Sequence, residues 1–185
     1  GLWGKSTMYQ ESVGVPMILA GPGIPSGRTV ATPVSHLDVF NTVLDVVGLP
    51  SALSTASQDS NSLMRPLAPD RKAFAEYHTV GSKSAVFMLR DKRAKYVHYE
   101  GLPDQLFDLE NDPEERVDLV ATQGQDPDIQ ARVAKWERDL RRICDPVKVD
   151  QRAKRRQAEL LEYFGGAEAA LASKGIGGFT PAPGN

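Results

Sequence analysis

Four short apolar segments followed by one long amphipathic helix constrain the fold of this chain most. The segments cover residues 73–79, 85–89, 95–99 and 105–109, and turn-forming residues separate them. Such spacing is typical of a small antiparallel meander. Downstream, apolar residues recur at intervals of 4, 3, 4 and 3, which is the helical period. These residues are Ile129, Val133, Trp136, Leu140 and Ile143. We therefore predict a small sheet that is covered by a helix.

The first fifty residues suggest a different layer. An apolar run at 15–20 ends in Gly-Pro-Gly, as expected for a strand that is buried on both faces of a parallel sheet. Ser35 and Asp38 match a capping box, and the helix they begin carries an apolar face before it stops at Gly48. The residues of that face are Leu37, Phe40, Leu44 and Val47. A lone strand and helix cannot cover both faces of a sheet, so we predict the edge of a larger α/β domain.

The remaining segments are a connection and a charged C-terminal region. Residues 51–72 are rich in Ser, Ala and Pro, which is typical of a surface connection. A second, strongly charged helix is predicted over about 149–164, and the Gly- and Pro-containing tail is expected to be irregular. The predicted units are 1–50 for the edge of the large α/β domain, 51–72 for the connection, 73–145 for the small sheet and helix subdomain, and 146–185 for the charged helix and tail.

Composition excludes several classes of protein. No apolar run approaches the roughly 20 residues that cross a bilayer, so no membrane span is predicted. The single cysteine, Cys144, excludes an internal disulfide framework and a zinc site built from several thiolates. The net charge of -2 argues against a protein that coats phosphates. These features favour neither a cytoplasmic nor a periplasmic location.

Histidines and one lysine are the candidates for chemistry. His36, His78 and His98 are widely separated and lack metal-ligand spacing. His36 follows a helix cap and His98 alternates within a predicted strand, so His78 is the histidine most typical of a site. Lys5 precedes the apolar run, and a lysine in such a place can present its ammonium to an anionic oxygen, although most lysines are solvated.

Opposite charges occupy neighbouring stretches near the C-terminus. Residues 104–128 are acidic, whereas residues 132–156 are basic. A nucleic-acid interface needs stacking aromatics on its basic face, but Trp136 belongs to the apolar stripe and Phe164 lies apart. We expect the charges to match each other within the molecule or between copies. Nucleic-acid binding through the basic helix is the less favoured alternative.

Several phrases in order resemble the C-terminal portion of a sulfatase of the alkaline phosphatase superfamily. They are GLWGKSTMYQES and VPMI in residues 1–18, GPG at 21–23, VSHLDV and TVLDVVG in residues 34–48, and QLFDLENDPEE at 105–115. The last is similar to the family phrase L-Y/F-D-L-x-x-D-P-x-E, whereas the family has Tyr-Glu-Glu more often than the Tyr-Gln-Glu found here. AEYH at 75–78 and TPAPG at 180–184 are similar to the choline-sulfatase and phosphonate monoester hydrolase branch.

The resemblance implies a fold and a chemistry. The fold would be α/β, the C-terminal part of the alkaline-phosphatase-like sulfatase fold, in which the small antiparallel sheet is packed by a helix. The activity would be hydrolysis of small-molecule sulfate esters, or of phosphate or phosphonate esters, by a metal-bound nucleophile made from Cys or Ser. That nucleophile and the ligands of a divalent metal, Ca or Mn, would lie upstream and not in this chain. Lys5 matches the family's sulfate-contacting lysine, and His78 is a second candidate for substrate binding.

Cys144 stands in a phrase that imitates the family's modification motif Cys-x-Pro-x-Arg. Here the phrase ends in Lys148 and follows the C-terminal helix, instead of lying in the N-terminal half. We therefore predict that Cys144 is unmodified.

The opening of the chain on Gly1 leads us to expect a fragment. On this interpretation the isolated chain neither binds metal tightly nor hydrolyses aryl sulfates. A different class of interpretation is a non-catalytic product, either a truncated reading frame or an interaction module. A homo-oligomer that forms through the charged helix and tail is a further expectation.

Overall fold

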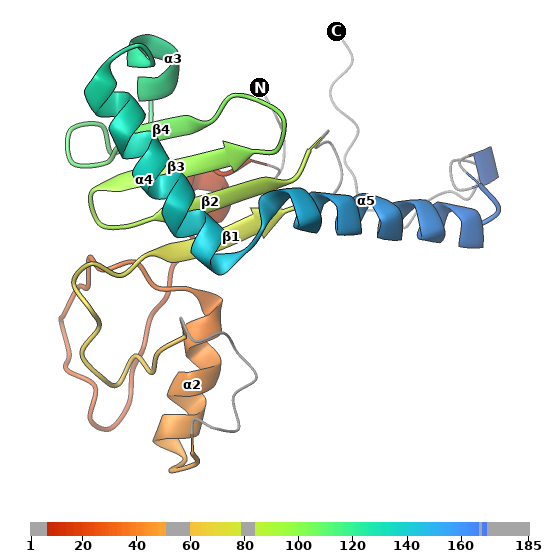
Figure 1. Cartoon of the computed structure of the whole chain (residues 1–185). Helices are drawn as coiled ribbons and strands as arrows, with labels where there is room; N and C mark the ends of the chain where they lie inside the picture. The colour runs from red at the N-terminus through yellow and green to blue at the C-terminus, as the bar shows by residue number, and fades with distance from the viewer. Residues whose placement is uncertain (1–6, 51–59, 79–83, 167, 170–185) are drawn as a thin grey trace, which may run out of the picture.

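A computed structural model describes residues 7–50, 60–78, 84–166 and 168–169 of the chain (Figure 1). The helices are α1 (Gln10–Val13), α2 (His36–Val46), α3 (Leu119–Gln123), α4 (Pro127–Ile143) and α5 (Pro146–Tyr163). The strands are β1 (Ala73–Tyr77), β2 (Val86–Arg90), β3 (Ala94–Tyr99) and β4 (Gln105–Asp108). None of these helices is both long enough and apolar enough to cross a membrane.

The four strands form one antiparallel sheet in the order β1-β2-β3-β4. Phe87 on β2 lies opposite Glu76 on one side and His98 on the other, and Lys95 lies opposite Phe107. Strand β2 is buried along most of its length because both faces of the sheet are covered. The predicted meander is therefore confirmed.

Helix α4 covers one face of this sheet (Figure 1). The carboxylate of Asp126 accepts a hydrogen bond from the Asp128 N–H, and a proline occupies the first turn. Apolar residues of the helix and the sheet then form one core: Phe87, Leu89, Tyr96, Leu106, Ile129, Trp136 and Leu140. The predicted stripe faces the sheet as expected, except that Ile143 in the last turn is 41% exposed.

The opposite face of the sheet is covered by the N-terminal segment that contains α1. Met8 is buried in a second core with sheet residues that alternate with those of the first: Val86, Met88, Val97 and Phe107. Because successive side chains of a strand point to opposite faces, one set of strands supplies both cores. The sheet therefore brings the segment that follows Lys5 against a subdomain formed far along the chain.

Helix α2 forms as predicted but buries a different face. The Asp38 carboxylate accepts a hydrogen bond from the Ser35 N–H at 2.8 Å, which fixes the start of the helix. Of the predicted apolar face only Leu44 is buried, whereas Phe40 is 49% exposed. The buried side chains are Asp38 and Thr42, which bond to residues 60–71. The apolar face is exposed because no described residues form a sheet against it.

The buried strand predicted at 15–20 is wrong for this structure. These residues form no strand, and Ile18 is 90% exposed. A strand needs a hydrogen-bonded neighbour, and none of the described strands pairs with this run. The second charged helix is confirmed, but it begins at Pro146, since Asp145 accepts a hydrogen bond from the Lys148 N–H and caps it.

Candidate functional site

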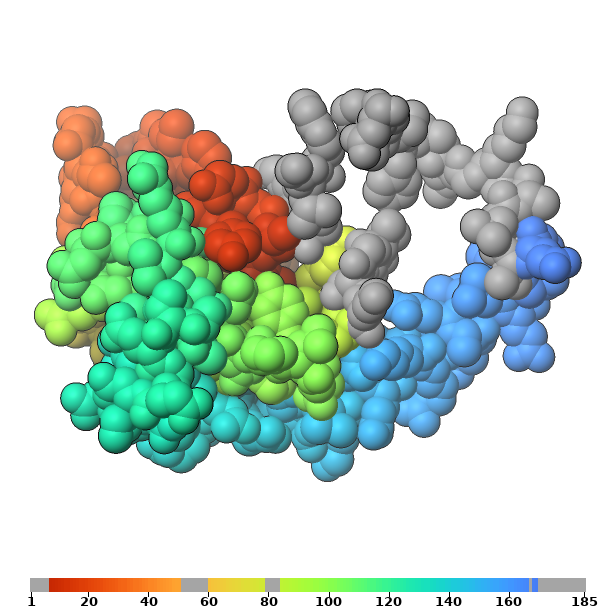
Figure 2. Space-filling view, turned by 90° about the horizontal axis from the view of Figure 1, so that it is seen from above, coloured from red at the N-terminus to blue at the C-terminus, as the bar shows by residue number. Residues whose placement is uncertain are grey.

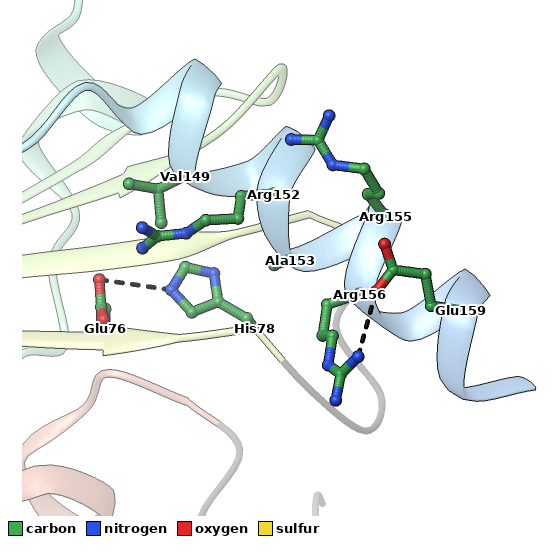
Figure 3. Close-up of a pocket in the computed structure, with 8 residues that line it drawn as sticks. All are labelled: Glu76, His78, Val149, Arg152, Ala153, Arg155, Arg156 and Glu159. Atoms are coloured by element: carbon green, nitrogen blue, oxygen red, sulfur yellow. Dashed lines mark hydrogen bonds and ion pairs between the residues drawn. The ribbon is translucent and has the colours of Figure 1, made fainter. Parts of the chain in front are cut away.

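His78 lies just after β1, where the strand passes beside α5. A cavity of about 410 Å³ lies between the strand end and the helix (Figure 3). We call it the arginine pocket; its lining residues are Glu76, His78, Val149, Arg152, Ala153, Arg155, Arg156 and Glu159. Of the two predicted site residues, His78 therefore lines a cavity, whereas Lys5 lies outside the described residues.

The His78 ring is held by packing. It meets the Phe87 ring edge-on, with the ring centroids 5.4 Å apart. Its Nε2 lies 3.4 Å from a Glu76 carboxylate oxygen, at ion-pair distance. Both ring nitrogens are buried, and neither makes a hydrogen bond to any residue that the structure describes. The imidazole is thus oriented, and its polar contact among the described residues is the one with Glu76.

Two hydrogen bonds fasten α5 beside the sheet, one from the Ala85 N–H to Asp150 and one from Gln157 to the His78 carbonyl. The buried Asp150 carboxylate accepts a hydrogen bond from the Ala85 N–H at 2.9 Å and pairs with Lys154 at 2.7 Å. Burial acts to raise the pKa of Asp150, but the bonds from Lys154 and Ala85 outweigh it, so that the pKa is lowered. The side-chain amide of Gln157 donates to the His78 carbonyl. Strand and helix therefore form fixed walls.

The charges on α5 are only partly compensated. Arg156 pairs with Glu159 at 3.1 Å, but Arg152 and Arg155 form no ion pair with any described residue. Elsewhere the basic residues of α4 and α5 pair largely within their own helices, as Arg141 does with Glu137. The basic stretch was expected to pair with the acidic residues 104–128, but these ion pairs do not join the two stretches. Net positive charge therefore remains at the arginine pocket.

A buried ion pair holds the segment that follows Lys5. Lys95 and Glu115 pair with side chains that are 0% and 1% exposed. The Lys95 ammonium also donates to the Met8 carbonyl at 2.9 Å, and Glu115 accepts from the Gln10 N–H at 3.0 Å. Burial lowers the pKa of Lys95, although the nearby Glu115 counteracts this effect. Residues 8–10 are thus tied to the sheet by groups that sequence reasoning did not single out.

The backbone at Glu115 is strained in order to make this contact. Its φ of 55° lies in the left-handed region, which is costly for a residue other than glycine. The turn is held by the Glu115 N–H, which donates to the Asp112 carbonyl, and by the Val117 N–H, which donates to the Asp112 carboxylate. The DPEE phrase therefore directs one carboxylate inward. A lysine inside a buried strand was the sequence signal that could have identified this pair.

His98 and Cys144 make contacts that stabilise the fold. His98 lies in β3 and bonds to Asp104 at 2.8 Å and to Glu100 at 3.3 Å. The hydrogen bond to Asp104 raises the pKa of His98 against the opposing effect of burial. Cys144 caps the end of α4 and packs against the sheet core, and burial raises the pKa of its thiol.

The described residues do not fit a divalent metal. They contain no cluster of three or more His, Cys, Asp or Glu side chains that could hold an ion. A guanidinium suits an anionic oxygen because it donates charged hydrogen bonds in a fixed geometry, and an imidazole beside it can add an N–H donor. The chemistry available at the arginine pocket is therefore anion binding.

The chain is similar in sequence to known sulfatases. Residues 1–142 match the family model described as N-sulphoglucosamine sulphohydrolase, C-terminal. The chain is 34% identical to arylsulfatase K of Danio rerio over 134 residues, which are 68% of this chain and 25% of the relative. It is 35% identical to choline-sulfatase of Rhizobium meliloti (strain 1021) over 123 residues, 65% of this chain and 24% of the relative. The chain thus spans about a quarter of the length of these relatives.

Solved structures show the same fold. A protein assigned as a sulfatase from Bacteroides thetaiotaomicron has a TM-score of 0.57 and 28% identity, over 80% of this chain and 32% of that chain. A 2-O GAG sulfatase has a TM-score of 0.53 and 26% identity, over 73% of this chain and 29% of that chain. The small antiparallel sheet with its helices is therefore the arrangement of sulfatase C-terminal domains, as predicted.

Proposed function

We propose, from the premise that the chain belongs to the N-sulphoglucosamine sulphohydrolase C-terminal family, that it forms the C-terminal part of an enzyme that hydrolyses sulfate esters. The match over residues 1–142 is the observation that carries this proposal. The names of the relatives, arylsulfatase K and choline-sulfatase, point to the same class of bond. Phosphate and phosphonate esters are related substrates that the same chemistry would accept.

The nucleophile and the divalent metal, Ca or Mn, would come from sequence outside this chain. The described residues offer no set of ligands for the ion, so we assign no step through the metal to them. A bound divalent ion would supply Lewis-acid polarisation of the ester. What this chain contributes in the proposal is substrate contact and the frame that orients it.

Lys5 would stabilise negative charge on the sulfate oxygens as the ester bond breaks. Support comes from the residues that follow it, because Lys95 and Glu115 hold the backbone at Met8 and Gln10. In this proposal the anchored backbone at Met8 and Gln10 would orient the segment that carries Lys5, and such preorganisation lowers the cost of reaching the transition state. His78 is the second proposed substrate contact, since its two ring nitrogens make no hydrogen bond to any described residue and Nε2 contacts only Glu76, at 3.4 Å.

The proposed domain arrangement follows from the exposed face of α2. Residues 1–50 would complete a large α/β catalytic domain, and residues 73–145 would form the small subdomain. Residues 51–72 would connect the two. Leu37, Phe40, Val43 and Val47 are 46%, 49%, 53% and 58% exposed, and an apolar face of this kind suits packing against another layer. The last unit, residues 146–185, would be the charged helix and the tail.

The test of the proposed function is Lys5→Ala in the protein that carries this chain together with its catalytic region. We expect kcat with 4-nitrophenyl sulfate to fall about 10²- to 10³-fold, as on removal of other donors to a developing oxyanion. Lys135→Ala, on the exposed side of α4, is the control and should leave kcat unchanged. Near-normal turnover of the Lys5 variant would remove this lysine from the site.

The isolated 185-residue chain provides a second test. We expect it to bind no divalent metal tightly and to leave aryl sulfates intact, because the proposed nucleophile and ligands lie elsewhere. Measurable turnover by the purified chain would contradict this division of roles.

We also propose a homo-oligomer that forms through the end of α5. Figures 1 and 2 show this helix extending past the sheet. Its last turns expose Leu160, Leu161, Tyr163 and Phe164 by 41%, 44%, 81% and 60%. Sedimentation of the chain and of a Tyr163→Ser, Phe164→Ser variant checks this, and a monomer at all concentrations would contradict it.

A further inference from the structure

The arginine pocket has the size and walls of a small-molecule site. Its volume of about 410 Å³ falls within the range of roughly 300–1,000 Å³ that is usual for ligand pockets. Val149 and Ala153, one turn apart on α5, supply an apolar wall. His78 closes the opposite side with an edge-packed ring (Figure 3). The cavity can therefore receive an apolar body as well as a charged group.

Unpaired positive charge faces this cavity. The Arg152 side chain extends from α5 toward Glu76 and His78 (Figure 3), and no described residue forms an ion pair with its guanidinium. Both ring nitrogens of His78 likewise have no hydrogen-bond partner among the described residues. A guanidinium beside an imidazole matches the two or three oxygens of a carboxylate or sulfate group. Arg155 adds a further unpaired charge to the lining.

The carboxylates of the pocket do not cancel this charge. Glu159 is engaged by Arg156 at 3.1 Å. Glu76 lies 3.4 Å from His78 and is 44% exposed, so its own repulsion of an anion is screened by water. Removal of the Glu76 charge should accordingly strengthen anion binding. A substitution of Glu76 is therefore expected to have the opposite effect to a substitution of Arg152.

Helix α5 lies beyond the residues that match the family model. The match covers residues 1–142, whereas α5 begins at Pro146. The strand wall of the pocket thus belongs to the family domain, while the arginine wall comes from beyond the matched region. Asp150 and Gln157 fasten the two walls together through the Ala85 N–H and the His78 carbonyl. Ligand recognition there depends on a helix that lies outside the matched residues.

We propose that the arginine pocket binds an organic anion, in which a carboxylate or sulfate group contacts Arg152 and His78 and an apolar body rests on Val149 and Ala153. That this group is a second, unreacting acidic group of a sulfate ester substrate rests on the proposed function. The pocket then selects esters whose leaving group carries an additional negative charge. Neutral and cationic leaving groups are disfavoured because they leave Arg152 unpaired.

Binding to the 185-residue chain tests the pocket without any need for turnover. The probes are benzoate and benzamide, which share a shape but differ in charge, together with inorganic sulfate, which lacks the apolar body. Titration is followed by the side-chain NMR resonances of His78 and of Val149. We expect benzoate to shift both residues at low ionic strength, sulfate to shift His78 only, and benzamide to shift neither appreciably.

Single substitutions assign the contacts. Arg152→Gln should weaken benzoate binding roughly fivefold to tenfold, and Arg155→Gln should weaken it less. Glu76→Gln should strengthen it. Arg138→Gln, which changes an exposed arginine of α4 outside the pocket, is the matched control and should have no effect. All four positions are half-buried or exposed, and the far-ultraviolet spectrum checks that each variant keeps its fold.

The outcomes separate this proposal from the proposed function. Equal binding of benzoate and benzamide, absence of benzoate binding at tens of millimolar, or equal loss in Arg138→Gln and Arg152→Gln would each overturn the pocket. A chain that binds benzoate as expected, but whose parent protein does not cleave sulfate esters, would keep the pocket and reject the hydrolase. Cleavage with no preference for carboxylated over neutral aryl sulfates would keep the hydrolase and reject the substrate assignment.

Discussion

Two regions of this molecule bury opposite kinds of side chain. The sheet and α4 enclose Phe87, Tyr96 and Leu140, each 0% exposed, between elements that lie within residues 73–143. Around α2 most buried groups are polar, with Asp38 paired to Arg71 at 2.7 Å, while Leu44 is the buried apolar residue of the helix and Phe40 is 49% exposed. The difference shows that the sheet has its packing partners in this chain, whereas the apolar side of α2 has none among the described residues.

The largest expected effect is the loss of stability on breaking the buried ion pair between Lys95 and Glu115. Lys95→Met leaves Glu115 buried without its cation, which should lower the free energy of unfolding by about 3–5 kcal/mol. Urea denaturation measures this, and hydrogen exchange should show Gln10 losing protection as well. Lys92→Met, at an exposed position, is the control. Recovery of stability in Lys95→Met with Glu115→Gln would confirm that the unpaired charge is the cause.

The comparison between the regions is sharpened by two truncations of apolar side chains. Leu140→Ala should cost about 2–5 kcal/mol because it opens a cavity between α4 and the sheet. Phe40→Ala on the exposed side of α2 should stay within about 0.5 kcal/mol. Equal losses measured by thermal or urea unfolding would mean that α2 is covered in solution.

Loss of the polar contacts that anchor α2 should lower the free energy of unfolding by less than the changes above, and the effect should be confined to α2. Asp38→Asn keeps an acceptor for the Ser35 N–H but loses the charge that faces Arg71, at a cost of about 1–3 kcal/mol. Hydrogen exchange should quicken in α2 and leave β2 unchanged. Loss of protection in β2 as well would show that the two regions unfold as one unit.

The smallest expected effect is the pH dependence of the sheet. The pKa of His98 is raised above its ordinary value of 6.5, chiefly by Asp104, so the folded state binds the proton more tightly than the unfolded chain does. This contribution is complete below about pH 6.5 and is lost as pH rises through the raised pKa. The loss should be about 1 kcal/mol or less, since the three side chains of the cluster keep 12%, 19% and 23% of their surface exposed. Asp104→Asn should reduce this slope and leave the smaller contribution of Glu100, and an unaltered slope would assign it to other groups.

Local signals in the sequence predicted the elements of the fold. The interval of the apolar stripe identified α4, and Ser35 with Asp38 identified the start of α2. Turn residues separated the four strands. Each of these depends on neighbours within a few residues, so the chain alone carries the information. The resemblance over residues 1–119 pointed to the family in the same way, as an order of short phrases.

Contacts between distant residues could not be predicted. The strand expected at 15–20 depended on a pairing partner, and none of the described residues supplies one. Lys95 appeared as an ordinary strand residue until the structure placed it beside Glu115 and the Met8 carbonyl. Arg152 belonged to the basic stretch that was expected to match the acidic residues 104–128 or another copy, whereas the structure places it beside His78.

The sequence by itself determined the sheet and its covering helix, because periodicity, capping and turn chemistry are local properties, and its ordered phrases carried the resemblance to the sulfatase family. Only the tertiary structure decided which face of α2 is buried, which charges meet in the core, and that His78 and Arg152 share one cavity. Those outcomes depend on desolvation and on the distance between groups that are far apart in the chain.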